Sequence, residues 1–244
     1  MACISIQNLY FGYDKNLFSN ISFDIDKKSF ICIYTPSSMG KTTLLKLISS
    51  KENKNIMIDS NIKKITYLSI DTTFYAKTVI EELLLVSNDI KRIKQLLLDF
   101  NMLKFLKVSP VNISYIEIQK LLLIKSILDG TDLLLIDNIF SFFDKHSKIE
   151  YMSYLKKYQF EKNMTIICTI NSLDDALFCD RIIIINNEII FNDSIDKLFP
   201  YNIDIKKTKL NISLQDDLIQ KLKLYEIIEN FNYTIEDLVG KICE

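Results

Sequence analysis

The stretch IYTPSSMGKTTLL, residues 33–45, decides the fold expected of this 244-residue chain. Its centre, MGKTT (residues 39–43), matches the end of the phosphate-binding loop pattern G-x-x-x-x-G-K-[ST]. The first glycine of that pattern is Thr35 here, and Ser38 stands where many such loops carry another glycine. A strand-like run, FICIY, precedes the loop and a helical run, KTTLLKLIS, follows it, which is the context that a phosphate loop requires.

The residue types in this loop suit phosphate chemistry. Backbone N–H groups and a helix N-terminus cradle phosphates, Lys41 adds a positive charge, and Thr42 can ligate magnesium. Gly40 is one of only four glycines in the chain, and its place directly before Lys41 indicates that the loop needs it. A hydrophobic strand ending in a magnesium-holding acid should accompany such a loop, and LLLID, which ends at Asp137, supplies it.

Short apolar runs alternate with helical patterns along the chain. The runs show little period-2 alternation, as expected of strands buried on both faces of a largely parallel sheet. They span residues 30–34, 65–68, 133–136, 165–169 and 182–185. The helical patterns span residues 41–49, 78–86, 89–105, 115–128 and 145–158. This order predicts an α/β fold, and the alternating stretches ISIQNLYFGY and ISFDID predict antiparallel strands at the N-terminus.

Composition excludes several classes of function. With 48% hydrophobic residues the chain can bury one sizeable core, and its net charge of −1 offers no broad basic surface for nucleic acid. Five cysteines, an odd number without C-x-x-C spacing, indicate reduced thiols rather than a disulfide framework. We find no signal peptide and no apolar run near the roughly 18 residues of a membrane span, so we expect a cytoplasmic protein.

Three further stretches resemble the ABC transporter ATPases. LLLIDNIFSFFD (residues 133–144) resembles their second nucleotide motif and the loop after it, usually LLLLDEPTSxLD. SPVNISYIEIQKLLLIKSIL (residues 109–128) resembles their signature, LSGGQxQR, and the helix after it. FGYDKNLFSNISFDI (residues 11–25) resembles the segment whose aromatic residue stacks on adenine; that residue is Tyr13 here, and a plain strand aromatic is the alternative. The matching motif residues are Asp137, Ser141, Asp144, Ser114, Glu117, Gln119 and Lys120.

The resemblance covers nearly the whole chain. Within the ABC family, the chain most resembles the energy-coupling-factor ATPases, which drive vitamin and metal-ion importers. Ser109-Pro110, TVIEE (residues 78–82) and SLDDALFCDRIIIINNEII (residues 172–190) carry it, and TIEDLVGKI near the C-terminus resembles a final helix of those subunits. It implies a P-loop NTPase of ABC ATPase type. We expect a nucleotide-binding domain at 1–199, with a helical subdomain at about 72–130, and a small helical appendage at 200–244.

The same resemblance implies that the chain binds ATP and Mg²⁺. The nucleotide ligands that it assigns are Tyr13, Ser37, Ser38, Met39, Gly40, Lys41, Thr42 and Thr43. Thr42 and Asp137 are the expected magnesium ligands. The implied partners are a second ABC ATPase subunit, a transmembrane component and a substrate-binding membrane subunit, which would place the chain peripherally on the inner face of the cell membrane.

Departures from the family pattern fall on the residues that split ATP. The catalytic glutamate position is Asn138, and an amide cannot accept a proton from water, a loss that costs roughly 10²–10⁴ in rate. The glutamine that senses magnesium falls at Ile70. The histidine that contacts the γ-phosphate falls at Asn171, with Ile170 as the other candidate, and the only histidine, His146, is expected on the surface.

The signature and the phosphate loop are altered as well. Tyr115 and Ile116 replace the two signature glycines, where a Cβ would obstruct the approach of backbone to phosphate. Thr35 raises the concern that a β-branched residue resists positive φ. Together these departures predict an importer's ATP-binding subunit with impaired hydrolysis. The alternative is a non-hydrolysing structural or regulatory partner of an intact ABC ATPase; action on DNA or ribosomes is disfavoured because no basic face is apparent.

Overall fold

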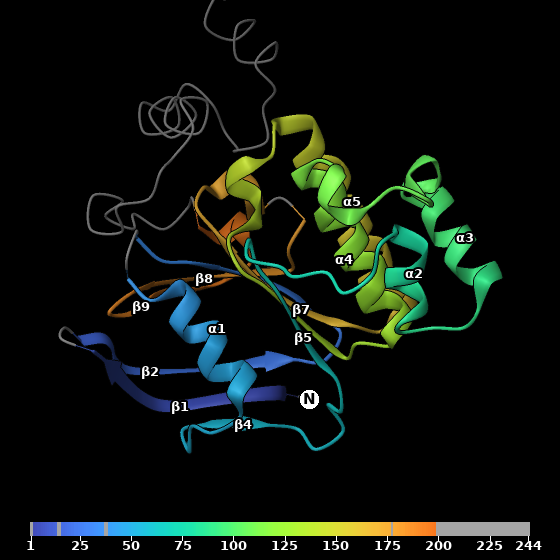
Figure 1. Ribbon diagram of the computed structural model, residues 1–244. Helices are drawn as coiled ribbons and strands as arrows, with labels where there is room; N and C mark the ends of the chain where they lie inside the picture. The colour runs from blue at the N-terminus through green and yellow to red at the C-terminus, as the bar shows by residue number, and fades with distance from the viewer. Residues whose placement is uncertain (1, 14–15, 37–38, 177, 199–244) are drawn as a thin grey trace, which may run out of the picture.

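The computed structural model describes residues 2–13, 16–36, 39–176 and 178–198, and the larger of its two sheets has the order β5-β6-β7-β3-β8-β9 (Figure 1). Its strands are β3 (Phe30–Tyr34), β5 (Ile65–Leu68), β6 (Leu133–Ile136), β7 (Thr165–Ile170), β8 (Arg181–Asn186) and β9 (Glu188–Asp193). The first five strands of this order run parallel, and β9 is antiparallel to β8. This confirms the predicted α/β fold with a mainly parallel sheet.

The smaller sheet is antiparallel and has the order β2-β1-β4. It consists of β1 (Ala2–Gly12), β2 (Asn16–Asp26) and β4 (Ile56–Ile58). Alternate residues of β2, among them Ile21, Phe23 and Ile25, are buried, as expected of a strand with one face on the core. The predicted N-terminal antiparallel strands are therefore confirmed.

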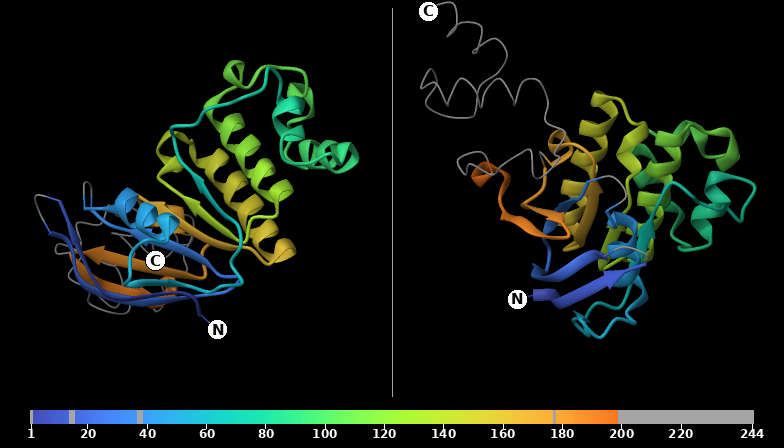
Figure 2. Two further views of the ribbon diagram at one scale, coloured as in Figure 1. Left: turned by 60° about the horizontal axis from the view of Figure 1, so that its bottom comes forward. Right: turned by 90° about the vertical axis from the view of Figure 1, so that its left-hand side faces the viewer.

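Helices cover both faces of the larger sheet. They are α1 (Lys41–Ser50), α2 (Val79–Leu84), α3 (Ile90–Asp99), α4 (Tyr115–Asp129) and α5 (Lys145–Lys162). One hydrophobic core joins α1 and the antiparallel sheet to the larger sheet, and the other joins α2–α5 to its opposite face. Figure 2 shows α2 and α3 at the side of the α4–α5 pair that faces away from the antiparallel sheet.

Short 3-10 turns link several of these elements. They are η1 (Leu103–Phe105), η2 (Pro110–Asn112), η3 (Ile139–Phe142), η4 (Leu173–Ala176) and η5 (Ile195–Lys197). One predicted helix, residues 89–105, is interrupted, because α3 ends at Asp99 and Asn101 adopts a left-handed backbone with φ of 56°. A single left-handed residue stops a right-handed helix, so η1 is a separate turn.

The expectations for the C-terminal region fall outside the described residues. They include the helical appendage at 200–244 and Cys243, and the boundaries of the domain and of its helical subdomain stay predictions. The cysteines of the described part, Cys3, Cys32, Cys168 and Cys179, carry free thiols. No helix among the described residues combines the length and the apolar character that crossing a bilayer requires.

Candidate nucleotide site

A cavity of about 940 Å³ lies at the carboxyl ends of strands in the parallel sheet. Ligands of open α/β sheets bind at this edge, because the loops that leave the strands converge there. The cavity is lined by Tyr13, Leu17, Tyr34, Thr35, Pro36, Met39, Gly40, Lys41, Thr42, Thr43, Asp137, Asn138, Asn171 and Asn186. The fold thus gathers most of the residues that the sequence assigned to nucleotide and magnesium; Ser37 and Ser38 lie outside the described residues.

The loop between β3 and α1 turns at Gly40, which caps α1 with φ of 94°. A Cβ at this position would lie 2.7 Å from Cζ of Phe18, so a side chain here would meet both backbone strain and a clash. This explains why a chain so poor in glycine keeps one at residue 40. The turn places Lys41, Thr42 and Thr43 at the start of α1, on the cavity.

The strain expected at Thr35 is not found, and that prediction is wrong. Thr35 directly follows β3, is fully buried, and is not among the residues with positive φ in the described part of the chain. Its hydroxyl donates to the carbonyl oxygen of Pro36 at 3.3 Å. Because φ is not positive at this position, a β-branched residue in place of glycine meets no left-handed strain.

Asp137 follows β6 and is held by two hydroxyl donors. The Thr169 hydroxyl donates to its Oδ1 at 3.0 Å, and the Tyr67 hydroxyl donates to its Oδ2 at 2.7 Å. Burial raises the pKa of Tyr67, and the hydrogen bond to Asp137 raises it further, so the phenol stays protonated and remains a donor. The oriented carboxylate and the Thr42 hydroxyl line the same cavity and are the hard oxygen ligands that Mg²⁺ takes from proteins.

Lys41 is the cation of the cavity wall. Its Nζ donates to the carbonyl oxygen of Ile170 at 3.3 Å and to Oδ1 of Asn171, and it lies 5.7 Å from the centre of the Tyr34 ring. Burial lowers the pKa of Lys41, and the negative charge of Asp137 opposes that shift. An ammonium group partly removed from water beside a helix N-terminus is well placed to bind a phosphate.

A neutral hydrogen-bond network continues from Lys41 through Asn171. Nδ2 of Asn171 donates to Oδ1 of Asn138 and, at 2.9 Å, to Oγ of Ser141. The Ser141 hydroxyl in turn donates to Oδ1 of Asn138 at 2.9 Å. None of these three side chains ionises in the physiological range, so this network supplies no general base.

Comparison with known proteins places this arrangement in a family. Residues 18–141, just over half of the chain, match the ABC transporter family. The chain belongs to that family. It is 27% identical to the energy-coupling factor transporter ATP-binding protein EcfA1 of Fusobacterium nucleatum, over 92% of this chain and 98% of that protein.

Two further similarities concern how much of each protein is matched and which fold the proteins share. The chain is 28% identical, over 80% of its length, to the lacticin-481/lactococcin-DR transport/processing ATP-binding protein of Lactococcus lactis, and the match covers 31% of that longer protein. The structure of cbiO1 from Clostridium perfringens, part of the ABC transporter complex cbiONQ, superposes with a TM-score of 0.72 and 17% identity. The match covers 91% of this chain and 98% of that one, and it shows the common fold.

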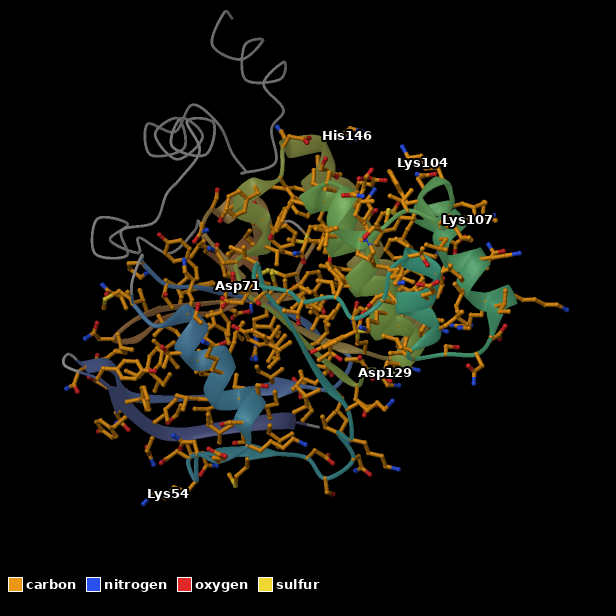
Figure 3. The ribbon with its side chains drawn as sticks, viewed as in Figure 1. Lys54, Asp71, Lys104, Lys107, Asp129 and His146 are labelled. Atoms are coloured by element: carbon orange, nitrogen blue, oxygen red, sulfur yellow. The ribbon has the colours of Figure 1, made fainter. Side chains whose placement is uncertain are left out.

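Of the other positions assigned from the ABC resemblance, some line the cavity and others lie away from it. Tyr13 lines it, is 76% exposed, and packs edge-to-face on Phe11 with ring centres 5.3 Å apart. Ile70 is 41% exposed and is not part of the cavity wall. Of the two candidates for the γ-phosphate position, the Ile170 side chain is buried and Asn171 lines the cavity. Figure 3 shows His146 at the outer edge of the molecule near the start of α5, where its side chain is exposed.

The residues that resemble the ABC signature make packing contacts and a helix cap. Ser114 caps α4 through a reciprocal pair of hydrogen bonds with Glu117. The Tyr115 ring packs edge-to-face on Phe142 and Phe143, with centres 5.2 and 6.0 Å apart, and its hydroxyl donates to the carbonyl oxygen of Ile139 at 3.3 Å. Burial raises the pKa of Tyr115 to about 12.

Sequence reasoning missed the residues that support the site from neighbouring strands. Thr169 and Tyr67 hold Asp137, and Tyr34 faces Lys41. Thr169 ends a predicted strand. A polar residue at the carboxyl end of a parallel strand could have indicated that it belongs to the site. Tyr67 gave none, because its contact with Asp137 depends on the pairing of β5 with β6.

Proposed function

We propose that this chain is an ATP-binding subunit of an energy-coupling-factor type importer for a vitamin or metal ion, in which hydrolysis is impaired. The observation that carries the proposal is the single cavity that unites the Lys41 ammonium, the Thr42 hydroxyl and the Asp137 carboxylate. That donor set suits a triphosphate and its Mg²⁺. The full-length similarity to EcfA1, an energy-coupling factor transporter protein, supports the importer assignment.

Two amides favour a second candidate, a non-hydrolysing structural or regulatory partner of an intact ABC ATPase. Asn138 and Asn171 occupy the positions of the catalytic glutamate and the γ-phosphate histidine, and they bond to each other. Neither can take a proton from the attacking water. In this role the chain would contribute a nucleotide-dependent interface and a docking surface instead of turnover.

The pairing of this chain follows from its altered signature. In the ABC family each nucleotide lies between the phosphate loop of one subunit and the signature of the other. Tyr115 and Ile116 stand at the signature glycines, so a homodimer would have two obstructed sites. ATP stabilises an interface only if it binds the closed pair better than the separate chains. We therefore propose a heterodimer with an intact ABC ATPase.

The segment at 70–82 is the proposed docking surface for a transmembrane component. Its Ile70 and Tyr75 side chains are 41% and 81% exposed. The buried Glu82 carboxylate accepts hydrogen bonds from the backbone N–H groups of Tyr75 and Ala76, both at 3.0 Å, and pairs with Lys125. An anchored loop that exposes apolar side chains suits a protein partner, which would place the chain on the inner face of the membrane beside a substrate-binding membrane subunit.

Co-purification tests the assembly. The tagged full-length chain, extracted from its own cells with a mild detergent, should bring down a second ABC ATPase with an intact signature and an integral membrane protein. A paired sample carrying Tyr75→Ser and Ile70→Ser should keep the second ATPase and lose the membrane protein. Recovery of only an ATP-dependent homodimer would contradict the proposed pairing.

A further inference from the structure

The orientation of the Asn138 amide follows from the donors and acceptors around it. The Lys41 ammonium group can only donate, so the Asn171 atom that faces it is Oδ1. The other amide atom of Asn171, Nδ2, then faces Asn138 and Ser141 as a donor. Asn138 must therefore turn its oxygen toward Asn171. One obligate donor, Lys41, thus fixes the polarity of both amides.

The oxygen of Asn138 is fully used by this network. It accepts one hydrogen bond from Asn171 and one from the Ser141 hydroxyl, which occupy its two lone pairs. The backbone of Asn138 is fixed as well, since its N–H donates to the Thr169 hydroxyl at 2.9 Å and its φ is 53°. Its amide NH₂ bonds to none of the described residues, and Asn138 lines the cavity.

We propose that Asn138 is a nucleotide-holding residue, whose NH₂ group donates to the terminal phosphate of ATP. The inference rests on the proposed binding of ATP and adds a role for this position. A glutamate here would present negative charge, whereas the oriented amide presents hydrogen-bond donors to a polyanion. The substitution therefore exchanges a residue that splits the terminal phosphate for one that retains it.

The network leaves Lys41 able to bind the nucleotide phosphate as well. An ammonium group has three N–H donors, and among the described residues two of them are engaged, with Ile170 and Asn171. The third can reach a phosphate while the first two maintain the polarity of the amides. Because only the terminal phosphate distinguishes ATP from ADP, Asn138 should raise the affinity for ATP and leave that for ADP unchanged.

The test is the ratio of Mg-ATP to Mg-ADP affinity, measured by calorimetry on the full chain. Asn138→Gly deletes the amide and tolerates positive φ. We expect its ATP affinity to fall by about 10-fold, the weight of a hydrogen bond to a charged group, with ADP affinity unchanged. Asn163→Gly is the matched control, because Asn163 also has positive φ, 54°, and lies at the end of α5 outside the cavity wall.

A second variant tests the same role without the extra backbone freedom that glycine introduces. Asn138→Asp keeps the shape of the side chain, removes the N–H donor and adds a negative charge that repels phosphate, so its ATP affinity should fall further than that of Asn138→Gly. Absence of binding of both nucleotides by the unmutated chain would refute the proposed ATP binding itself. Binding of ATP by the unmutated chain, with an unchanged ATP-to-ADP ratio in either folded variant, would overturn the role of Asn138 alone.

Discussion

Two groups of residues in the cavity wall differ in the chemistry that they offer to a nucleotide. In the first group Lys41, Thr42 and Asp137 supply an ammonium, a hydroxyl and a carboxylate. In the second group Asn138 and Asn171 form a neutral amide pair. Holding a triphosphate and splitting it depend on different residues, so one capacity can persist while the other is lost. The first group matches the ABC pattern and the second departs from it.

The largest expected effect concerns the amide pair and its consequence for turnover. The purified chain should release phosphate from Mg-ATP at background, because without a general base the rate falls by roughly 10²–10⁴. Asn138→Glu alone should not restore release, because Asn171 and the signature positions Tyr115 and Ile116 stay changed. The measurement is phosphate release over time, and rapid release by the unmutated chain would show that the amide pair does not prevent hydrolysis.

The next effect concerns Lys41 and the binding of nucleotide. Lys41→Ala should abolish detectable Mg-ATP binding. A charge-assisted contact to phosphate contributes roughly 1.5–3 kcal/mol, and a weak site that loses this contact no longer binds measurably. Lys46→Ala removes the same charge from an exposed position of α1 and should bind as the unmutated chain does. Equal calorimetric affinities for the two variants would show that Lys41 does not contact the nucleotide.

A smaller effect is expected at the signature, where Ser114 caps α4. Ser114→Ala should lower the free energy of unfolding by about 1 kcal/mol, because an N-cap hydrogen bond is lost. Ser114→Asp, another good N-cap residue, should retain the stability. Urea unfolding followed by circular dichroism measures both. Equal stability of all three proteins would show that the capping box contributes nothing.

The smallest effect is a proton linkage at Lys41. Burial lowers the pKa of Lys41, and a bound polyphosphate would raise it again by favouring the ammonium form. At alkaline pH, ATP binding should therefore take up protons, and affinity should weaken as the pH rises through the pKa of the free protein. Calorimetry in buffers with different ionisation enthalpies measures this uptake; proton release on binding would contradict the sign.

Local pattern predicted β3 and β5–β8 and most helices, because runs buried on both faces of a parallel sheet are continuous and apolar. It missed β4 and β9, which lie at sheet edges. The interruption after Asp99 escaped prediction, since the left-handed turn at Asn101 breaks an otherwise helical pattern. Motifs located Lys41, Thr42 and Asp137. The contact from Lys41 to Asn171 joins residues 130 positions apart, and the support of Asp137 by Tyr67 depends on strand pairing. Such contacts follow from topology, which no short pattern contains.

The central claim is that this chain retains ATP without splitting it. The most direct measurement is a calorimetric titration of the unmutated chain with Mg-ATP, followed by chromatography of the nucleotide in the same sample after prolonged incubation. We predict saturable binding with one ATP per chain and recovery of the nucleotide as ATP. Absence of binding, or recovery of the nucleotide as ADP, would contradict the claim.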